Sequence, residues 1–449
     1  MKKTSILITL SIILSRSVLG QTVLEDYIKE GFQKNQSIQQ KEFAFEKSVY
    51  ALKEAKSLFL PNITFMTDYS LAGGGRTVDF PVGDLLNPVY NSLNQLTNSN
   101  RFPQLENQNI LLNPNNFYDA KFRTTMPLLD LEIEYNKRIK REQVAIQQVE
   151  INLYKRELVK EIKTAYFKYL QSVQAIKIYD IALKLVQESK RINESLFKND
   201  KVNRTVVLRA ENEITKFEAI RENAVQNSNS AKAYFNFLLN RNLTDNISVD
   251  LNYQNAATFF GDSTSISQRE ELLKLQLGNN INQHLLRLSK TYIVPKLNTF
   301  LDLGSQGFDW KFDNKTRYYF FGVSLQWDLF KSGRNKYKIK QAAIDNKILH
   351  SQTDYVENQL QLQFTTSVNN FNGSLFSYQA AVSAFTTSQK FHNDMLRLYK
   401  EGQALFIELL DAQNQLIQSE LQVNVSLYDT YIKAAEIERA NASFKINNN

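Results

Sequence analysis

The sequence has no cysteine and little glycine or proline. Its 449 residues include 14 glycines, 7 prolines and no cysteine. The missing cysteine excludes a disulfide framework and any metal site built on thiolates. Residues that interrupt regular structure are scarce, which favours long helices. The three histidines, His284, His350 and His392, are scattered, so we predict no metal and no other cofactor.

The positive charge is not concentrated anywhere. The formal net charge is +8, but lysine and arginine alternate with glutamate and aspartate along stretches that we expect to be helical. A nucleic-acid-binding protein would gather its basic residues on one face. We therefore predict solvated helix faces and no nucleic-acid partner.

The N-terminus has the features of a secretory signal. Lys2 and Lys3 precede the apolar residues 6–14, and Val18-Leu19-Gly20 forms a small-residue cleavage signal before Gln21. These features predict a signal peptide over residues 1–20, with an apolar run too short to span a bilayer. No later run of 18 apolar residues predicts a transmembrane helix, so we expect an exported protein.

The same order of predicted elements occurs twice. The first half has a helix, a strand hairpin and a pair of coiled-coil helices, at 21–60, 61–128 and 129–242. The second half has the corresponding elements at 266–294, 295–330 and 331–443. A connector over 243–265 joins the halves, and a tail over 444–449 ends the chain. The expected fold is thus two repeats of helix-strand-strand-helix-helix.

Sequence offsets support a duplication. "LFKNDKVNRTVVLRAENEI" from Leu196 resembles "LYKEGQALFIELLDAQNQL" from Leu398 at an offset of 202, and "PLL" at 127–129 matches "DLF" at 328–330 at 201. Pro61 and Pro295, each at the start of a predicted strand, differ by 234. The offset falls by 33 only across the first hairpin, so that hairpin carries a longer loop.

The predicted strands alternate between apolar and polar residues. In the last strand the apolar positions are Tyr319, Phe321, Val323, Leu325 and Trp327. Apolar-out and polar-in alternation of this length is typical of a transmembrane β-barrel strand facing lipid. Four strands cannot close a barrel, so two or three copies would have to associate. A small soluble sandwich packed on the helices is the alternative.

The long loop of the first hairpin spans residues 72–116. It is rich in glycine, proline and asparagine, and a loop of this length is usually functional or disordered. Its apolar stretch "DLLNPVYNSL" predicts that part of it packs against something, as an interfacial or plug-like element.

Taken together, these features resemble the TolC-like outer-membrane efflux and secretion channels (outer membrane factors). The resemblance covers essentially the whole mature chain. It rests on the two prolines before the strands, the strand-to-helix segments "PLLDLE" and "DLFKSGR", and the tip "YKEGQALFIELLDAQNQL". It implies an α+β membrane protein: a homotrimer with a twelve-stranded outer-membrane barrel continuous with a long periplasmic coiled-coil barrel, the loop over 72–116 being extracellular.

The resemblance also implies partners and a function. The partners would be a periplasmic adaptor (membrane fusion protein), an inner-membrane transporter of RND, ABC or MFS type, and outer-membrane lipid. The function would be a passive exit duct of a tripartite efflux or type I secretion system. Drug, metal, peptide and protein substrates are not distinguished by the sequence. Alternatives are a periplasmic coiled-coil adaptor or structural protein with a soluble β-domain, or an exported enzyme on a helical scaffold. We predict no enzyme, because no nucleophile elbow or phosphate loop is present.

Two acidic residues match the family's periplasmic constriction. Glu408 and Asp411 are three residues apart, which places both carboxylates on one helix face. In a trimer they would form two rings of negative charge that favour cations. An ordinary solvated helix face is the alternative.

The gate and adaptor-docking residues implied by the resemblance lie in the two helix turns. They are Phe197, Asp200, Lys201, Val202, Tyr399, Gly402, Ala404 and Leu405. Tyr399 matches a gating aromatic and Gly402 a left-handed turn position, whereas Ala404 replaces a latch arginine. Asp200 stands where the second repeat has Gly402, and aspartate also tolerates the left-handed conformation. Val206 and Arg209 stand where the second repeat has its acids.

Overall fold

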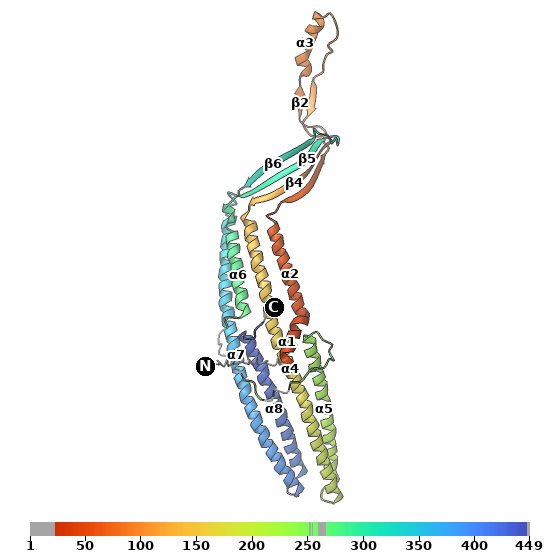
Figure 1. Cartoon of the computed structure of the whole chain (residues 1–449), viewed down its shortest axis with the longest axis vertical. Helices are drawn as coiled ribbons and strands as arrows, with labels where there is room; N and C mark the ends of the chain where they lie inside the picture. The colour runs from red at the N-terminus through yellow and green to blue at the C-terminus, as the bar shows by residue number, and fades with distance from the viewer. Residues whose placement is uncertain (1–22, 251–252, 254, 259–265, 447–449) are drawn as a thin grey trace, which may run out of the picture. The chain divides into compact units, whose positions relative to one another are not determined.

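The computed structural model describes residues 23–250, 253, 255–258 and 266–446, in two compact units. Unit 1 comprises residues 1–48, 143–279 and 347–449, and unit 2 comprises residues 49–142 and 280–346. Figure 1 labels their helices and strands. The predicted signal peptide (1–20) lies outside the described residues, as do parts of the connector (243–265) and of the tail (444–449).

Long helices dominate the chain, as the scarcity of glycine and proline predicts. They are α1 (Val23–Lys34), α2 (Gln36–Ser57), α4 (Leu131–Lys198), α5 (Arg204–Leu238), α6 (Glu270–Leu288), α7 (Arg334–Lys400) and α8 (Phe406–Ala440), with a 3₁₀ turn at Thr291–Ile293. Among the described helices, none is both long enough and apolar enough to cross a membrane.

The main core of unit 1 joins α1, α4 and α5. Ile28, Tyr166 and Phe235 are fully buried there, and the ring of Tyr27 meets the ring of Phe235 edge-on at 5.0 Å. A Cβ at Gly31 would lie only 2.6 Å from Ile162 Cδ1, so glycine allows α1 to approach α4 closely.

The segment 21–60 was predicted as one helix, but the structure divides it at Asn35. The Asn35 Oδ1 accepts hydrogen bonds from the backbone N–H groups of Ser37 (2.9 Å) and Ile38 (3.2 Å), which caps the start of α2. Its Nδ2 donates to the carbonyl of Leu238 at 3.0 Å, at the end of α5. One side chain therefore ends α1, begins α2 and fixes both against α5.

A charged cluster ties α8 to α4 and α6 within unit 1. Arg439 donates to Glu157 (3.0 Å) and Glu271 (2.8 Å), and Arg269 donates to Glu271 at 2.6 Å. Burial alone would raise the pKa of Glu271, but these two guanidinium groups lower it to about 2. The carboxylate thus remains charged at any physiological pH.

Unit 2 contains a four-stranded antiparallel sheet in the order β1-β4-β5-β6. The strands are β1 (Asn62–Ser70), β4 (Phe117–Leu129), β5 (Lys296–Phe308) and β6 (Arg317–Gln326). Pro61 and Pro295 directly precede β1 and β5, which explains why helix stops before each strand. β1 and β6 form the two edges, each paired on one side only.

The two faces of this sheet differ in chemistry. One register row crosses all four strands as Phe65, Phe122, Leu303 and Tyr319, and every member is exposed. On the other face, Arg123 forms a two-pronged ion pair with Asp302 at 2.7 and 2.6 Å. The residues predicted to face lipid, Tyr319, Phe321, Val323, Leu325 and Trp327, are all exposed, although Trp327 lies just past the end of β6.

The segment 72–116, predicted as a loop, contains regular structure. It forms a second, two-stranded sheet from β2 (Thr77–Phe80) and β3 (Gln108–Leu111), with helix α3 (Val82–Leu96) between them. Only part of the glycine, proline and asparagine content that predicted a loop lies in the connections, because α3 itself contains Gly83, Asn87, Pro88, Asn91 and Asn94. Part of this segment therefore packs, as its apolar residues indicated.

Candidate functional site: the two helix turns

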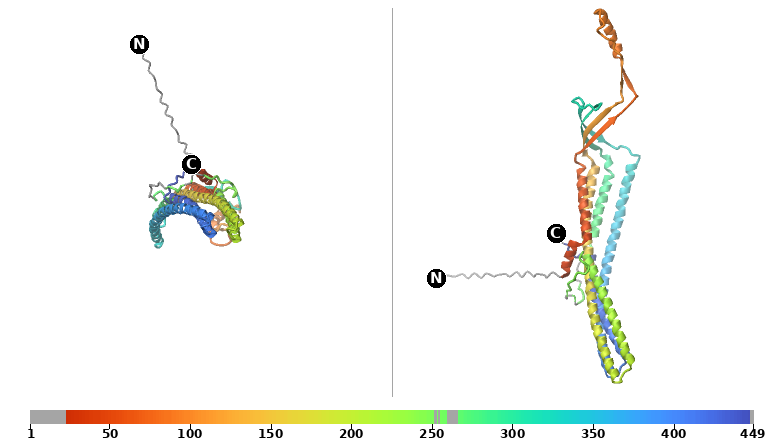
Figure 2. Two further views of the ribbon diagram at one scale, coloured as in Figure 1. Left: turned by 90° about the horizontal axis from the view of Figure 1, so that it is seen from below. Right: turned by 90° about the vertical axis from the view of Figure 1, so that its right-hand side faces the viewer.

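Two tight turns in unit 1 connect the long helices. The first turn (residues 199–203) joins α4 to α5, and the second turn (residues 401–405) joins α7 to α8. The helix ends at Lys198 and Lys400 differ by 202, as do the helix starts at Arg204 and Phe406. Figure 2 shows both turns at the same end of unit 1.

The two turns have the same backbone. Asp200 and Gly402 are both left-handed, with φ of 55° and 73°. The backbone N–H of Lys201 donates to the carbonyl of Leu196 at 2.9 Å, and in the second turn Gln403 donates to Leu398 at 2.8 Å. These are the hydrogen bonds of a Schellman motif, which satisfies the last carbonyls of a helix.

A shared apolar cluster joins the turns to each other. Tyr399, Phe406 and Leu409 of the second hairpin are buried against Ala210 of α5. The partly buried residues around them come from both hairpins: Ile192, Leu196, Val206, Met395, Leu396 and Ala404. Of the predicted tip residues, Tyr399 and Ala404 belong to this cluster, whereas Phe197, Asp200, Lys201 and Val202 of the first turn do not.

Polar contacts missed by the sequence analysis lie beside this cluster. The buried Tyr399 hydroxyl donates to Asn193 Oδ1 of α4, and Gln413 Nε2 of α8 donates to Ser189 Oγ. Burial raises the pKa of Tyr399, so the hydroxyl stays protonated and remains a donor. The sequence does contain a pattern that predicts this contact. The spacing of a coiled-coil stripe is followed by Val186, Ser189, Asn193 and Leu196. Polar residues in such a stripe mark a contact between helices.

This contact is incompletely satisfied. Among the described residues, Asn193 Nδ2 and Gln413 Oε1 are buried without a hydrogen-bond partner, as is the Nε2 of His392, seven residues before Tyr399 on α7. Each such atom costs roughly 1–3 kcal/mol relative to a solvated one. Burial also lowers the pKa of His392, which keeps the imidazole neutral. The seam between the two hairpins is therefore weaker here than an apolar seam of the same size.

Glu408 has a structural role that its predicted position at a constriction did not reveal. Its Oε2 accepts a hydrogen bond from the backbone N–H of Leu405 at 2.7 Å, which caps α8. In the first turn the equivalent cap residue is Asn203, whose side chain makes no such bond.

Glu408 and Asp411 are both exposed on α8. Asp411 accepts a hydrogen bond from Gln415 Nε2 at 2.9 Å. Within the described part of the chain, neither carboxylate forms a salt bridge with a basic residue. Their negative charges are thus free to act on something outside this chain.

The remaining predicted tip residues lie on the surface. Phe197, Asp200, Lys201 and Leu405 are exposed, whereas Val202 and Ala404 are half-buried. Phe197, which occupies the position equivalent to Tyr399, is 41% exposed, against 5% for Tyr399.

The two turns carry opposite charge. Residues 196–209 contain four basic residues and one acidic residue, a net charge of +3. The matching residues 398–411 contain one basic and three acidic residues, a net charge of −2. Any partner that contacts both turns meets a basic and an acidic surface side by side.

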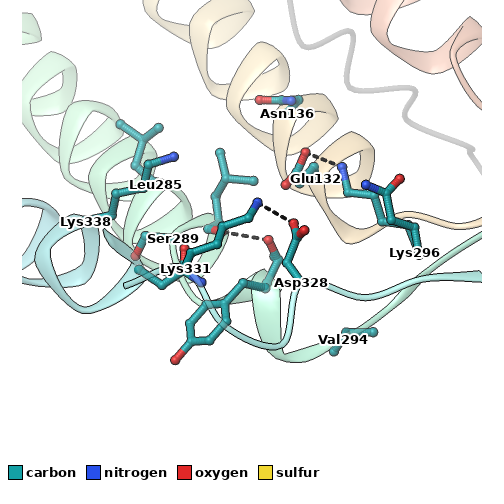
Figure 3. Close-up of a pocket in the computed structure, with 14 residues that line it drawn as sticks. Glu132, Asn136, Leu285, Ser289, Val294, Lys296, Asp328, Lys331 and Lys338 are labelled. Atoms are coloured by element: carbon teal, nitrogen blue, oxygen red, sulfur yellow. Dashed lines mark hydrogen bonds and ion pairs between the residues drawn. The ribbon is translucent and has the colours of Figure 1, made fainter. Parts of the chain in front are cut away.

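A pocket in unit 2 offers no comparable chemistry. It has a volume of about 370 Å³ and is lined by charged residues at the strand-to-helix connections (Figure 3). Four of the charged side chains are already paired, since Lys296 reaches Glu132 at 2.5 Å and Lys331 pairs with Asp328. No cluster of histidine, aspartate and glutamate able to hold a metal occurs among the residues that the structure describes.

One family model matches the C-terminal part of the chain. Residues 263–442, which include α6 to α8, match the model of the family described as outer membrane efflux protein. No curated protein sequence matches.

Solved structures match almost the whole chain. CusC, a transmembrane channel, has a TM-score of 0.77 at 12% identity, over 94% of this chain and 92% of its own. The outer membrane channel CmeC of Campylobacter jejuni has a TM-score of 0.75 at 13% identity, over 94% and 85%. The outer membrane channel MtrE of Neisseria gonorrhoeae, in its open state, has 0.74 at 14%, over 93% and 88%.

These matches confirm the resemblance to TolC-like outer-membrane channels. At 12–14% identity the structures establish a common fold. The family match covers the part of the chain that contains the second turn.

Proposed function

We propose that the protein is an outer-membrane exit duct of a tripartite efflux or type I secretion system. The observation that carries the proposal is the exposed apolar face of the sheet, which continues across all four strands. Water would make such a face costly, and lipid would cover it. The family match and the fold of outer-membrane channels support the same location, with the helices extending into the periplasm.

The duct is a homotrimer. The sheet has open edges at β1 and β6, and four strands are too few to close a barrel. Pairing β6 of one copy with β1 of the next removes both edges and gives twelve strands in three copies. The equal offsets of the helix pairs support a duplicated repeat, so six turns, three of each kind, alternate around the periplasmic end.

The turns form the gate and the docking site. Exposed Glu408 and Asp411 provide two rings of negative charge in the trimer, which select cations. The unsatisfied polar seam at Tyr399 and Asn193 provides a contact that separates when the end opens. A periplasmic adaptor contacts both kinds of turn, and an RND, ABC or MFS transporter delivers the substrate. The duct itself performs no chemistry.

The first test is the mass of the mature protein after membrane fractionation. We expect release only by detergent and a particle of three chains by light scattering with detergent subtracted. A monomer or dimer released without detergent would reject the duct and support the alternative, a periplasmic coiled-coil adaptor or structural protein with a soluble β-domain.

The second test addresses the acidic rings. The double variant Glu408→Gln with Asp411→Asn should lose cation selectivity, and with it block by multivalent cations, in planar bilayers. Arg209→Gln, which removes a charge at the position in the first repeat equivalent to Asp411, is the matched control and should retain both. Equal selectivity in all three proteins would remove the constriction from the proposal.

A further inference from the structure

Helix α3 turns partly buried asparagines towards its own chain and exposes apolar residues on the opposite side. Asn87 and Asn94 face the returning segment 102–105, where each side chain exchanges two hydrogen bonds with the backbone. Asn87 bonds both backbone groups of Leu105 at 2.9 and 2.8 Å, and Asn94 bonds those of Phe102 at 2.8 and 3.1 Å. These amides, together with the ring of Tyr90 at 5.6 Å from that of Phe102, hold α3 against the returning segment.

The opposite side of α3 is an apolar stripe. Leu85, Val89 and Leu96, here called the α3 stripe, are 69%, 51% and 83% exposed. Their spacing of four and seven residues places them on one helix face. This is the reverse of a helix that packs on its own chain, so the stripe fits a partner outside the chain.

The two-stranded sheet of β2 and β3, here called the ribbon, connects to α3 and has an exposed apolar face. On one face of the two-stranded sheet, Val78, Phe80 and Ile110 are exposed. A two-stranded hairpin alone is marginally stable in water and needs further strands or a helix against it. Figure 1 shows α3 at the far end of this ribbon, beyond the ends of β4, β5 and β6.

A lipid surface does not fit the stripe. Helices that lie on lipid carry lysine or arginine on their polar face and often tryptophan beside the apolar one. Helix α3 (Val82–Leu96) contains no lysine, arginine or tryptophan, its one charged residue is Asp84, and the nearest arginines, Arg76 and Arg101, lie outside the helix.

A second copy of the same chain does fit. The stripe is uncharged, so two copies meet there without repulsion. The ribbon continues from β1 and β4, and β1 is an edge that pairs with the neighbouring copy in the proposed trimer. That pairing brings the three ribbons to the same end of the barrel, within reach of one another.

We infer that the α3 stripes of the three copies pack together, forming a helical cluster at the barrel end opposite the long helices. The inference rests on the proposed trimer, because it needs the ribbons at one rim. It gives the segment 72–116 a structural role in joining subunits.

Cysteine cross-linking tests this contact, and the natural absence of cysteine gives a clean background. Leu96→Cys and Val89→Cys place a single thiol on the stripe. The control is Gln95→Cys, which is also exposed but lies about 100° around the helix from Leu96. Each detergent-extracted protein is mildly oxidised and run without reductant, and its mass is measured on the same sample before oxidation.

We expect disulfide-linked pairs with the two stripe variants, involving up to two of the three chains in each particle, and several-fold fewer with Gln95→Cys. Trimers without linked pairs would overturn the inference and leave the duct intact, with lipid or another protein on the stripe. Equal linkage at Gln95 and Leu96 would also overturn it, because it would reflect random collision. A particle that is not trimeric would reject the duct itself.

Discussion

In the first turn, Asp200 holds the left-handed position, an exposed Phe197 precedes it, and α5 begins without a side-chain cap. In the second turn, Gly402 holds that position, a buried Tyr399 precedes it, and Glu408 caps α8. The backbone hydrogen bonds are nevertheless the same at an offset of 202. The comparison shows that the turn geometry is set by the backbone, which leaves the side chains free to specialise.

The second turn carries most of the specialised side chains. The second turn carries the buried link to α4, the unpaired acids and the match to the efflux family. The first turn is basic and supplies the surface against which the second turn packs. We therefore expect substitutions in the second turn to have the larger effects, in the order given below.

The largest difference in stability should be between the Tyr399→Ala and Phe197→Ala variants. Removing the buried Tyr399 ring should cost about 3–5 kcal/mol of local stability, whereas the half-exposed Phe197 should cost less than about 1 kcal/mol. Native-state hydrogen exchange of the peptides around both turns measures this difference. Tyr399→Phe should fall between them, at about 1–3 kcal/mol, because it leaves Asn193 Oδ1 unpaired. Equal exchange in both alanine variants would contradict the asymmetry.

Gly402→Ala should have the next largest effect. A Cβ there would touch nothing within 4 Å, so the cost is that of left-handed backbone alone, about 1–2 kcal/mol. Gly402→Asn should cost less, and Asp200→Gly should change stability little, since both aspartate and asparagine tolerate this conformation. Thermal unfolding followed by circular dichroism compares the three variants. A Gly402→Ala protein as stable as the parent would show that the turn relaxes.

Substitutions at the Glu408 cap of α8 should change stability less. Glu408→Ala should destabilise α8 by about 1 kcal/mol through loss of the bond to the Leu405 N–H, whereas Glu408→Gln should keep most of it. Val206→Glu should add the missing partner in the first turn and slow exchange at the start of α5 slightly. If Glu408→Gln exchanges as fast as Glu408→Ala, the negative charge matters more than the hydrogen bond.

The smallest effect should be a pH dependence confined to the second hairpin. Burial lowers the pKa of His392, whereas the unfolded imidazole binds a proton below about 6.5. Stability is therefore fully present above that pH and declines as pH falls towards the lower, folded pKa. The equivalent residue in the first hairpin, Lys190, pairs with Glu211 at 3.0 Å and does not titrate in this range. His392→Gln should remove the part of this pH dependence that lies just below 6.5, as measured by hydrogen exchange of α7 peptides. The same loss of stability with and without His392 would assign it to another group, such as His284, whose pKa is also lowered by burial.

Much of the helical fold could be predicted because its signals are local. The scarcity of proline and glycine predicts the long helices, and the prolines at 61 and 295 predict where helix gives way to strand. The left-handed turn at Asp200 was also expected from its residue type, and it is found.

The features that were missed depend on partners far apart in the sequence. The division at Asn35 depends on Leu238, and the buried bond of Tyr399 depends on Asn193. The cap by Glu408 was hidden because Leu405 is not a residue that normally begins a helix. Helix α3 was missed because its asparagines were read as loop residues, although they fix it to the returning chain.

The pairing of β4 with β5 has a consequence for how the chain folds. Ala120 lies opposite Ser305, so the central seam of the sheet joins segments separated by the whole first helix pair and the connector. Contacts this distant in sequence form slowly. Until residues 296–308 arrive, β1 and β4 are a lone hairpin with a free edge, which another chain can pair with. The β4 edge of a nascent chain therefore stays unpaired for the time between its two hairpins.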